Sequence, residues 1–160
     1  MQQLNETHDP SLRSWVDSAN DPAGDFPIQN LPFVVFDRGS GGEPGVLIGD
    51  RVLALRPAAE AGAVPGKGCF SGSTLNGFAA AGREVWSGVR ASVSRMLRHG
   101  SEARASSQAW LIPAKDVQFR VPMAIGDYTD FYASIDHATT VGSMFRPDNP
   151  LLPNYRHVPI

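Results

Sequence analysis

The chain has 160 residues, with 42% hydrophobic and 19% charged side chains and a formal net charge of -2. A chain of this length and composition can bury a core of ordinary size, which excludes an intrinsically disordered protein. The near-neutral charge and the lack of an apolar run of roughly 18 residues argue against nucleic acid and membrane as partners.

The N-terminal segment, residues 1–24, predicts a loosely ordered arm because it is polar and ends in the turn sequence NDPAG. It lacks the basic and apolar regions of a secretory signal peptide. Cys69 is the only cysteine, which excludes an internal disulfide and a cysteine-based zinc site. These features favour a cytoplasmic location in a reducing compartment.

Residues 25–55 contain the clearest structural signals. An aromatic and β-branched run at 33–36 predicts a strand. In GVLIGDRVLAL, residues 45–55, two apolar runs lie on either side of Gly49-Asp50, a dipeptide that a two-residue hairpin turn accepts. Gly49 can adopt a positive φ without the steric clash of a Cβ. We therefore predict a β-hairpin over this stretch.

From Ser73 the apolar residues recur at spacings of three and four, which predicts one long amphipathic helix. The stripe consists of Leu75, Phe78, Gly82, Val85, Trp86, Val89, Val93, Met96 and Leu97. Ser73 or Thr74 can cap the start of this helix, and Gly100 suits its end. We interpret Trp86 and Met96 as core residues rather than as ligand contacts.

Three shorter elements complete the pattern. Residues 58–63 predict a helical turn, and residues 109–112 and 117–121 predict two short strands separated by Pro113. The chain after Pro122 shows little periodicity, so no regular structure is predicted there. In a compact domain, a long stretch of this kind is usually functional or incomplete.

That stretch contains IGDYTDFYASIDHATTVGSMFR, residues 125–146, which concentrates acidic, aromatic and basic side chains. Asp127 and Asp130 carry the carboxylate oxygens that Mg²⁺ and Ca²⁺ prefer. Two acids do not complete a site, because Ca²⁺ takes six to eight oxygen ligands. On spacing alone, a structural role for Asp127 in capping a turn or the next helix is favoured over metal binding.

His137 is a candidate general base, since a histidine titrates near neutral pH. Asp136 is a poor partner for it, because neighbours in sequence point in different directions. Arg146 has the geometry to bind both oxygens of a carboxylate. Taken singly, a histidine is more often structural and an arginine more often a surface residue. Together, these residue types fit metal-assisted attack of water on a carbonyl.

Five segments, in this order along the chain, resemble the fumarylacetoacetase family. They are DFPIQNLPF (25–33), STLNGF (73–78), IGDYTDFY (125–132), HATTVGSMFR (137–146) and LLPNY (151–155). The family hydrolyses a carbon–carbon bond of 4-fumarylacetoacetate, giving fumarate and acetoacetate in the last step of tyrosine and phenylalanine degradation. The resemblance thus implies a metal-dependent hydrolase with a small diketo acid as substrate.

By motif, Asp130 matches the family's first ligand for Ca²⁺ or Mg²⁺, and His137 matches the base that activates water. Tyr132 and Arg146 match residues that bind the substrate. Thr140 and Val34 stand where the family commonly has Asn and Gly. Neither departure falls on one of the four transferred residues.

The resemblance also implies a fold that is mainly β with one long helix. It places a small SH3-like barrel at residues 25–120, and the start of an all-β catalytic domain at 121–160. The family's other metal ligands would lie beyond this sequence, so we expect the 160-residue chain to be an inactive, truncated part of a homodimeric enzyme.

Apolar residues after position 120 should then lack their partner surface: Val121, Met123, Ile125, Phe131, Phe145, Leu151 and Leu152. The alternative function is a non-catalytic structural or dimerisation domain. An unrelated metal-dependent hydrolase would need a cluster of acids that the sequence does not supply.

Overall fold

The computed structural model describes residues 4–129 and 131–157. The chain divides into two compact units, of which the first ends at Ala124 and the second begins at Ile125. In these described ranges, no helix combines the length and the apolar character needed to cross a membrane. The domain boundaries expected from the sequence, after residues 24 and 120, stay predictions.

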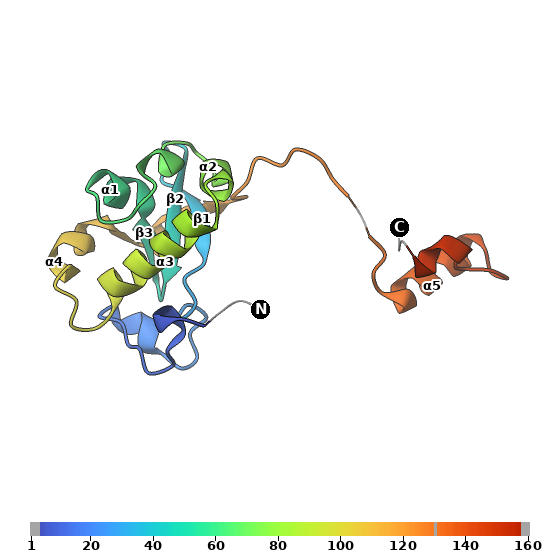
Figure 1. Ribbon diagram of the computed structural model, residues 1–160, viewed down its shortest axis with the longest axis horizontal. Helices are drawn as coiled ribbons and strands as arrows, with labels where there is room; N and C mark the ends of the chain where they lie inside the picture. Colours follow the sequence, from blue (N-terminus) through green and yellow to red (C-terminus); the bar gives the residue numbers. More distant parts are fainter. Residues whose placement is uncertain (1–3, 130, 158–160) are drawn as a thin grey trace. The chain divides into compact units, whose positions relative to one another are not determined.

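A five-stranded antiparallel sheet forms the framework of the first unit (Figure 1). Its strands are β1 (Phe33–Asp37), β2 (Gly42–Ile48), β3 (Arg51–Ala54), β4 (Leu111–Pro113) and β5 (Gln118–Arg120). The order across the sheet is β4-β3-β2-β1-β5. The first three strands are therefore a local meander, and the last two are added at its edges. Each strand corresponds to a strand predicted from the sequence.

The predicted hairpin is confirmed. Ile48 of β2 pairs with Arg51 of β3, which leaves Gly49 and Asp50 as the two-residue turn. Gly49 has a φ of 53°. A Cβ at this position would lie 2.6 Å from the backbone nitrogen of Ala19. Both the backbone conformation and the close approach of the N-terminal segment therefore require glycine here.

The SH3-like barrel implied by the resemblance is not confirmed. Closure of a barrel requires that the first and last strands of the sheet pair with each other. Strands β4 and β5 lie at opposite ends of the strand order, and no pairing joins them within the residues described. With its helices, the first unit is a small mixed α/β domain with an open sheet, rather than the mainly β fold expected.

The helices of the first unit are α1 (Leu55–Glu60), α2 (Asn76–Ala80), α3 (Arg83–Leu97) and α4 (Arg104–Ser107), and the second unit contains α5 (Ile135–Phe145). Short 3-10 helices lie at Glu6–His8, Asp17–Asn20, Lys67–Phe70, Gln108–Trp110, Ala114–Asp116 and Pro153–Arg156. Helix α1 overlaps the helical turn predicted at 58–63. Helix α3 contains 15 residues and lies along one face of the sheet (Figure 1).

The single long helix predicted from Ser73 onward is corrected to two helices, α2 and α3. Gly82 separates them with a φ of 85° and a ψ of 169°, which lie outside the helical region. Leu75 occupies the N-cap position of α2 without a side-chain hydrogen bond, so the predicted cap from Ser73 or Thr74 is not formed. The sequence pattern concealed the break because Gly82 falls on the apolar stripe at helical spacing.

Hydrophobic clusters cover both faces of the sheet. Side chains alternate between the two faces along each strand, so neighbouring residues enter different clusters. The larger cluster joins the sheet to α3 and includes Val46 from β2 and Val89 from α3, both fully buried. The smaller cluster is formed by Phe36, Leu47, Val52 and Ala54.

Phe36 is the largest side chain of the smaller cluster and is fully buried. Gly45 on the neighbouring strand leaves room for its ring. A Cβ at Gly45 would lie 2.9 Å from the Phe36 Cε1 atom and 2.7 Å from the Val52 Cγ1 atom. Glycine inside a strand commonly marks such a close approach. The cross-strand partner of Phe36 on β5 is Phe119, which is 49% exposed.

The N-terminal segment packs against the C-terminal end of α3. Ser14 forms an isolated antiparallel bridge with Arg98. The Ser14 hydroxyl donates to the Leu97 carbonyl at 2.7 Å, and the Trp15 indole N–H donates to the Met96 carbonyl at 2.9 Å. The last carbonyls of a helix have no partner within the helix. The N-terminal segment therefore supplies donors to two of the last carbonyls of this helix.

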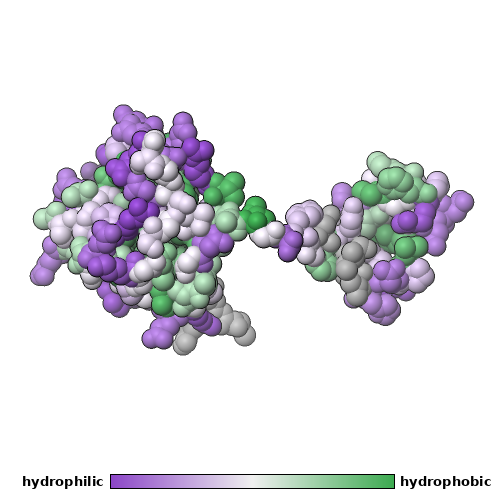
Figure 2. Space-filling model, turned by 90° about the horizontal axis from the view of Figure 1, so that it is seen from above, coloured by the Kyte–Doolittle hydropathy of each residue, from purple (hydrophilic) through white to green (hydrophobic). Residues whose placement is uncertain are grey.

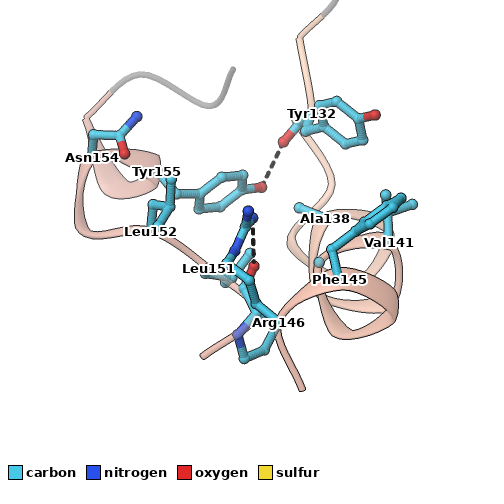
Figure 3. Close-up of a pocket in the computed structure, with 11 residues that line it drawn as sticks. Tyr132, Ala138, Val141, Phe145, Arg146, Leu151, Leu152, Asn154 and Tyr155 are labelled. Atoms are coloured by element: carbon cyan, nitrogen blue, oxygen red, sulfur yellow. Dashed lines mark hydrogen bonds between the residues drawn. The ribbon is translucent and has the colours of Figure 1, made fainter. Parts of the chain in front are cut away.

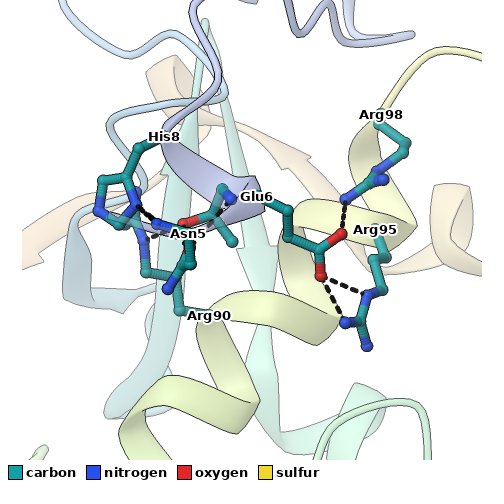
Figure 4. A network of polar contacts seen from close by, with 7 residues as sticks. Asn5, Glu6, His8, Arg90, Arg95 and Arg98 are labelled. Carbon is teal, nitrogen blue, oxygen red and sulfur yellow. Dashed lines mark hydrogen bonds and ion pairs between the residues drawn. The ribbon is translucent and has the colours of Figure 1, made fainter. Parts of the chain in front are cut away.

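Charged side chains add to this attachment (Figure 4). The Glu6 carboxylate accepts hydrogen bonds from Arg95 Nε at 2.9 Å and from Arg98 Nη2 at 3.3 Å. Beside them, Arg90 Nε donates to the Thr7 hydroxyl at 3.0 Å. The hydrogen bond from Arg95 is the main cause that lowers the pKa of Glu6 below its ordinary value.

Acid is expected to weaken this contact. Because the pKa of Glu6 is lower in the folded protein than in the unfolded chain, its contribution is fully present above the unfolded pKa and is lost as the pH falls through the folded value. Urea denaturation of Glu6→Gln should show a loss of stability at neutral pH that disappears in acid. Glu60→Gln, on an exposed carboxylate without an ion pair in the described chain, is the control. An equal loss at both pH values would contradict the assignment.

The second unit contains α5, the 3-10 helix Pro153–Arg156 and the loop between them. The sequence predicted no regular structure here, and α5 corrects that prediction. Ser134 caps this helix, since its side chain accepts from the His137 backbone N–H at 3.4 Å. The pattern was hidden because β-branched residues at 139–141 and Gly142 give the centre of α5 a low intrinsic helix propensity.

Several of the apolar residues expected to lack a partner surface are exposed. They are Val121, Met123, Ile125, Phe131, Phe145 and Leu152. Leu151 is half-buried. Figure 2 shows hydrophobic surface in green on each unit, interspersed with polar surface in purple.

Candidate functional site

The described site residues lie around helix α5 in the second unit. Tyr132 precedes the helix, His137 lies in its first turn, and Arg146 follows its last residue as the C-cap. At a rise of about 1.5 Å per residue, His137 and Arg146 are separated by roughly 14 Å along the helix axis. The helix therefore holds these two candidates at opposite ends. Asp130, the predicted metal ligand, lies outside the described residues.

The structure brings Tyr132 and His137 together. Their rings are stacked, with centroids 5.3 Å apart and an angle of 11° between the ring planes. Tyr132 is half-buried and His137 is exposed, so one face of the imidazole is covered and its edge stays open to solvent. Aromatic pairs favour offset-stacked arrangements at this separation. The stack thus sets the plane of the candidate base nearly parallel to the Tyr132 ring.

Asp136 does not orient His137. No hydrogen bond joins their side chains in the part of the chain that is described. The Asp136 backbone carbonyl instead accepts from the Thr140 hydroxyl at 2.9 Å, one helical turn away. This arrangement agrees with the expectation that adjacent residues on a helix point in different directions. Any carboxylate that orients the imidazole must come from another part of the protein.

Arg146 lies at the edge of a pocket of about 260 Å³ (Figure 3). The pocket is lined by Tyr132, Ala138, Val141, Gly142, Phe145, Arg146, Pro150, Leu151, Leu152, Asn154 and Tyr155. The Arg146 Nη2 atom donates to the Pro150 carbonyl at 3.4 Å, and the residue is exposed. A guanidinium beside apolar walls suits an anion with an apolar body.

The described residues do not complete a metal site. Within the described ranges, 4–129 and 131–157, no group of three or more His, Cys, Asp or Glu side chains is placed to hold an ion. Ca²⁺ takes six to eight oxygen ligands and Mg²⁺ takes six. Asp127 and Asp136 are the described carboxylates nearest to Tyr132 in sequence and both are exposed, so a metal here would depend on ligands from elsewhere.

Two residues of this unit have roles that the sequence did not reveal. The Tyr155 hydroxyl donates to the Tyr132 backbone carbonyl at 2.6 Å. Gly142 is buried in α5, and a Cβ there would overlap the carbonyl oxygen of Pro150 and lie 2.8 Å from its carbon. A glycine within a helix often marks such packing. The sequence could not indicate this role for Gly142, because α5 itself was not predicted.

The sequence model of the family described as "Fumarylacetoacetase N-terminal" matches residues 29–122, more than half of the chain. The chain belongs to this family. The match ends within the first unit and does not include the residues around α5. The fumarylacetoacetase N-terminal family therefore accounts for the sheet and its helices, and the assignment of the site residues rests on the sequence motifs outside that match.

Curated relatives extend the similarity into the second unit. The chain is 38% identical over 164 residues to the fumarylacetoacetase of Oryza sativa subsp. japonica, covering 93% of this chain and 38% of the relative. It is 41% identical to that of Rattus norvegicus, over 92% of this chain and 37% of the relative. It is also 41% identical to the fumarylacetoacetase of Caenorhabditis elegans, over 85% of this chain and 35% of the relative. The chain thus spans less than two fifths of each fumarylacetoacetase named.

Proposed function

We propose that this chain contributes the substrate-binding and general-base half of a fumarylacetoacetase site. The complete enzyme would hydrolyse 4-fumarylacetoacetate to fumarate and acetoacetate, and the 160 residues alone would be inactive. The stacking of Tyr132 on His137 carries the proposal, because it presents a preoriented base beside a phenol in a segment shared with fumarylacetoacetases. Family membership supports the same reaction class.

In the proposed reaction, the His137 imidazole takes a proton from water. The water oxygen then bonds to the carbonyl carbon, and the adjacent carbon–carbon bond breaks. Its electron pair moves to the carbon that leaves as acetoacetate, which takes up a proton. The consumption of one water thus balances the two products. General-base assistance of this kind contributes about 10²- to 10⁴-fold in rate.

The other residues would bind and orient the substrate. Arg146 lies beside an apolar pocket and suits a substrate carboxylate, which its guanidinium can bind through two hydrogen bonds. The Tyr132 phenol would donate a hydrogen bond to a substrate oxygen. Asp130 would supply one ligand to Ca²⁺ or Mg²⁺, which would stabilise negative charge on the diketo oxygens when bound. The remaining ligands would come from outside this chain.

The test is a chimera in which this chain replaces the aligned part of the rat fumarylacetoacetase. It is expected to hydrolyse fumarylacetoacetate, and His137→Ala should reduce kcat by about 10²- to 10⁴-fold. His99→Ala, which removes an exposed histidine of the first unit, should leave kcat unchanged. The 160-residue chain by itself should show no turnover with either ion. A chimera as active with His137→Ala as without it would refute the assigned base, and an inactive chimera would favour a structural role for the chain.

A further inference from the structure

The segment that carries Tyr132 has an irregular backbone. Tyr132 belongs to no helix or strand, and it is the central residue of a short turn in which the Ala133 N–H donates to the Phe131 carbonyl at 2.9 Å. Even so, its ring lies nearly parallel to that of His137. The Tyr132 carbonyl takes no part in the turn bond, so it is available to a donor from another segment.

The contact with the Tyr132 carbonyl comes from Tyr155. Its hydroxyl donates to the Tyr132 carbonyl at 2.6 Å, and both residues are half-buried. In Figure 3 the Tyr155 ring extends from the C-terminal segment toward Tyr132. The bond joins residues 23 positions apart in the sequence, so it ties the C-terminal segment to the one before α5.

The segment that carries Tyr155 also packs against α5. Gly142 allows the Pro150 carbonyl to approach the helix more closely than any side chain would permit. The contacts therefore form a closed ring. His137 stacks on Tyr132, Tyr132 is bound by Tyr155, and the segment 150–155 packs through Pro150 against Gly142 of the helix that carries His137.

We propose that Tyr155 is a positioning residue, which holds Tyr132 in place against His137 through the Tyr132 backbone carbonyl. The inference rests on the proposed function, because it assigns Tyr155 to the same site. Tyr155 touches neither substrate nor reacting atoms in this role. It determines where the phenol that binds substrate and the imidazole that activates water lie relative to each other.

The experiment measures the stack directly, by NMR of the isotopically labelled 160-residue chain. A stacked phenol shifts the ring protons of His137 upfield, and Tyr132→Leu gives the value without a stack. Tyr155→Phe removes only the hydroxyl and is expected to move the His137 ring signals to the Tyr132→Leu value. Tyr128→Phe makes the same chemical change at an 84% exposed tyrosine and should leave those signals in place.

Two NMR outcomes would overturn the proposal. An unchanged His137 signal in Tyr155→Phe would show that the hydroxyl does not hold the stack. A signal lost together with the helical Cα shifts of residues 135–145 would show that Tyr155 maintains the helix rather than the position of Tyr132. Since no substrate or metal is present, an inactive chimera would leave this result standing.

The same substitution in the chimera tests whether the position matters for the reaction. A displacement of about 1 Å in a substrate-binding group can cost up to about 100-fold in rate. Tyr155→Phe is therefore expected to lower kcat/KM by up to that factor, while Tyr128→Phe leaves it unchanged. A lost stack with unaltered kcat/KM would overturn the role of Tyr155 as a positioning residue for catalysis.

Discussion

Replacement of Phe36 by alanine is expected to lower the free energy of unfolding of the first unit by about 3–5 kcal/mol. The ring is fully buried in the smaller cluster, and Gly45 on the next strand has no side chain that could fill the space. The substitution therefore removes buried apolar surface and leaves a cavity that the sheet cannot close. Urea denaturation followed by circular dichroism would measure the loss.

The matched control is its cross-strand partner. Phe119→Ala makes the same chemical change on the neighbouring strand β5, but Phe119 is 49% exposed. We expect it to cost much less than Phe36→Ala, because exposed apolar surface contributes little to stability. Similar losses for the two variants would mean that the smaller cluster does not exclude water as the structure indicates.

Gly142→Ala is expected to destabilise α5 by about 1–3 kcal/mol, the typical cost of overpacking. The direction of this change in stability is informative, since alanine normally stabilises the interior of a helix by up to about 1 kcal/mol relative to glycine. Here the added methyl group would overlap the Pro150 carbonyl oxygen, so the segment after the helix must move away. Amide hydrogen exchange of α5 would report the free energy of its opening.

Gly126→Ala provides the comparison within the second unit. A Cβ at Gly126 meets no atom within 4 Å, and the residue lies outside any helix. Exchange in α5 should be unaffected by this change. Slower exchange in Gly142→Ala than in the parent chain would show that helix propensity outweighs the contact with Pro150, and would remove one link from the ring of contacts around Tyr132.

The sheet was predictable because its signals are local. The hairpin at 45–55 could be recognised from two apolar runs and one Gly-Asp turn, and the structure confirms it. The helix break at Gly82 could not be predicted, because glycine is compatible both with the apolar stripe and with a backbone of positive φ. The open sheet was not predictable either. Which edges remain unpaired depends on the placement of two three-residue strands, which local patterns do not determine.

The candidate site was named from residue types and motifs, and its arrangement could not be predicted. The sequence motifs pointed to Tyr132, His137 and Arg146, but the assignment of their roles stays a prediction. The stack of Tyr132 on His137 depends on a helix that the sequence pattern did not indicate. The contribution of Tyr155 was hidden for a further reason. Its contact is made to a backbone carbonyl, which any residue at position 132 would present.

The position of β5 has a consequence for how the chain folds. β1 to β3 are consecutive and can pair as soon as residues 33–54 have been synthesised, whereas Val35 of β1 also pairs with Arg120 of β5. Closing so long a loop costs chain entropy before the contact stabilises anything, which slows folding. On the ribosome, a nascent chain that has not reached position 120 would hold a three-stranded meander with one side of β1 still open. During synthesis, that side would be an unpaired strand edge, to which a strand of another chain can add.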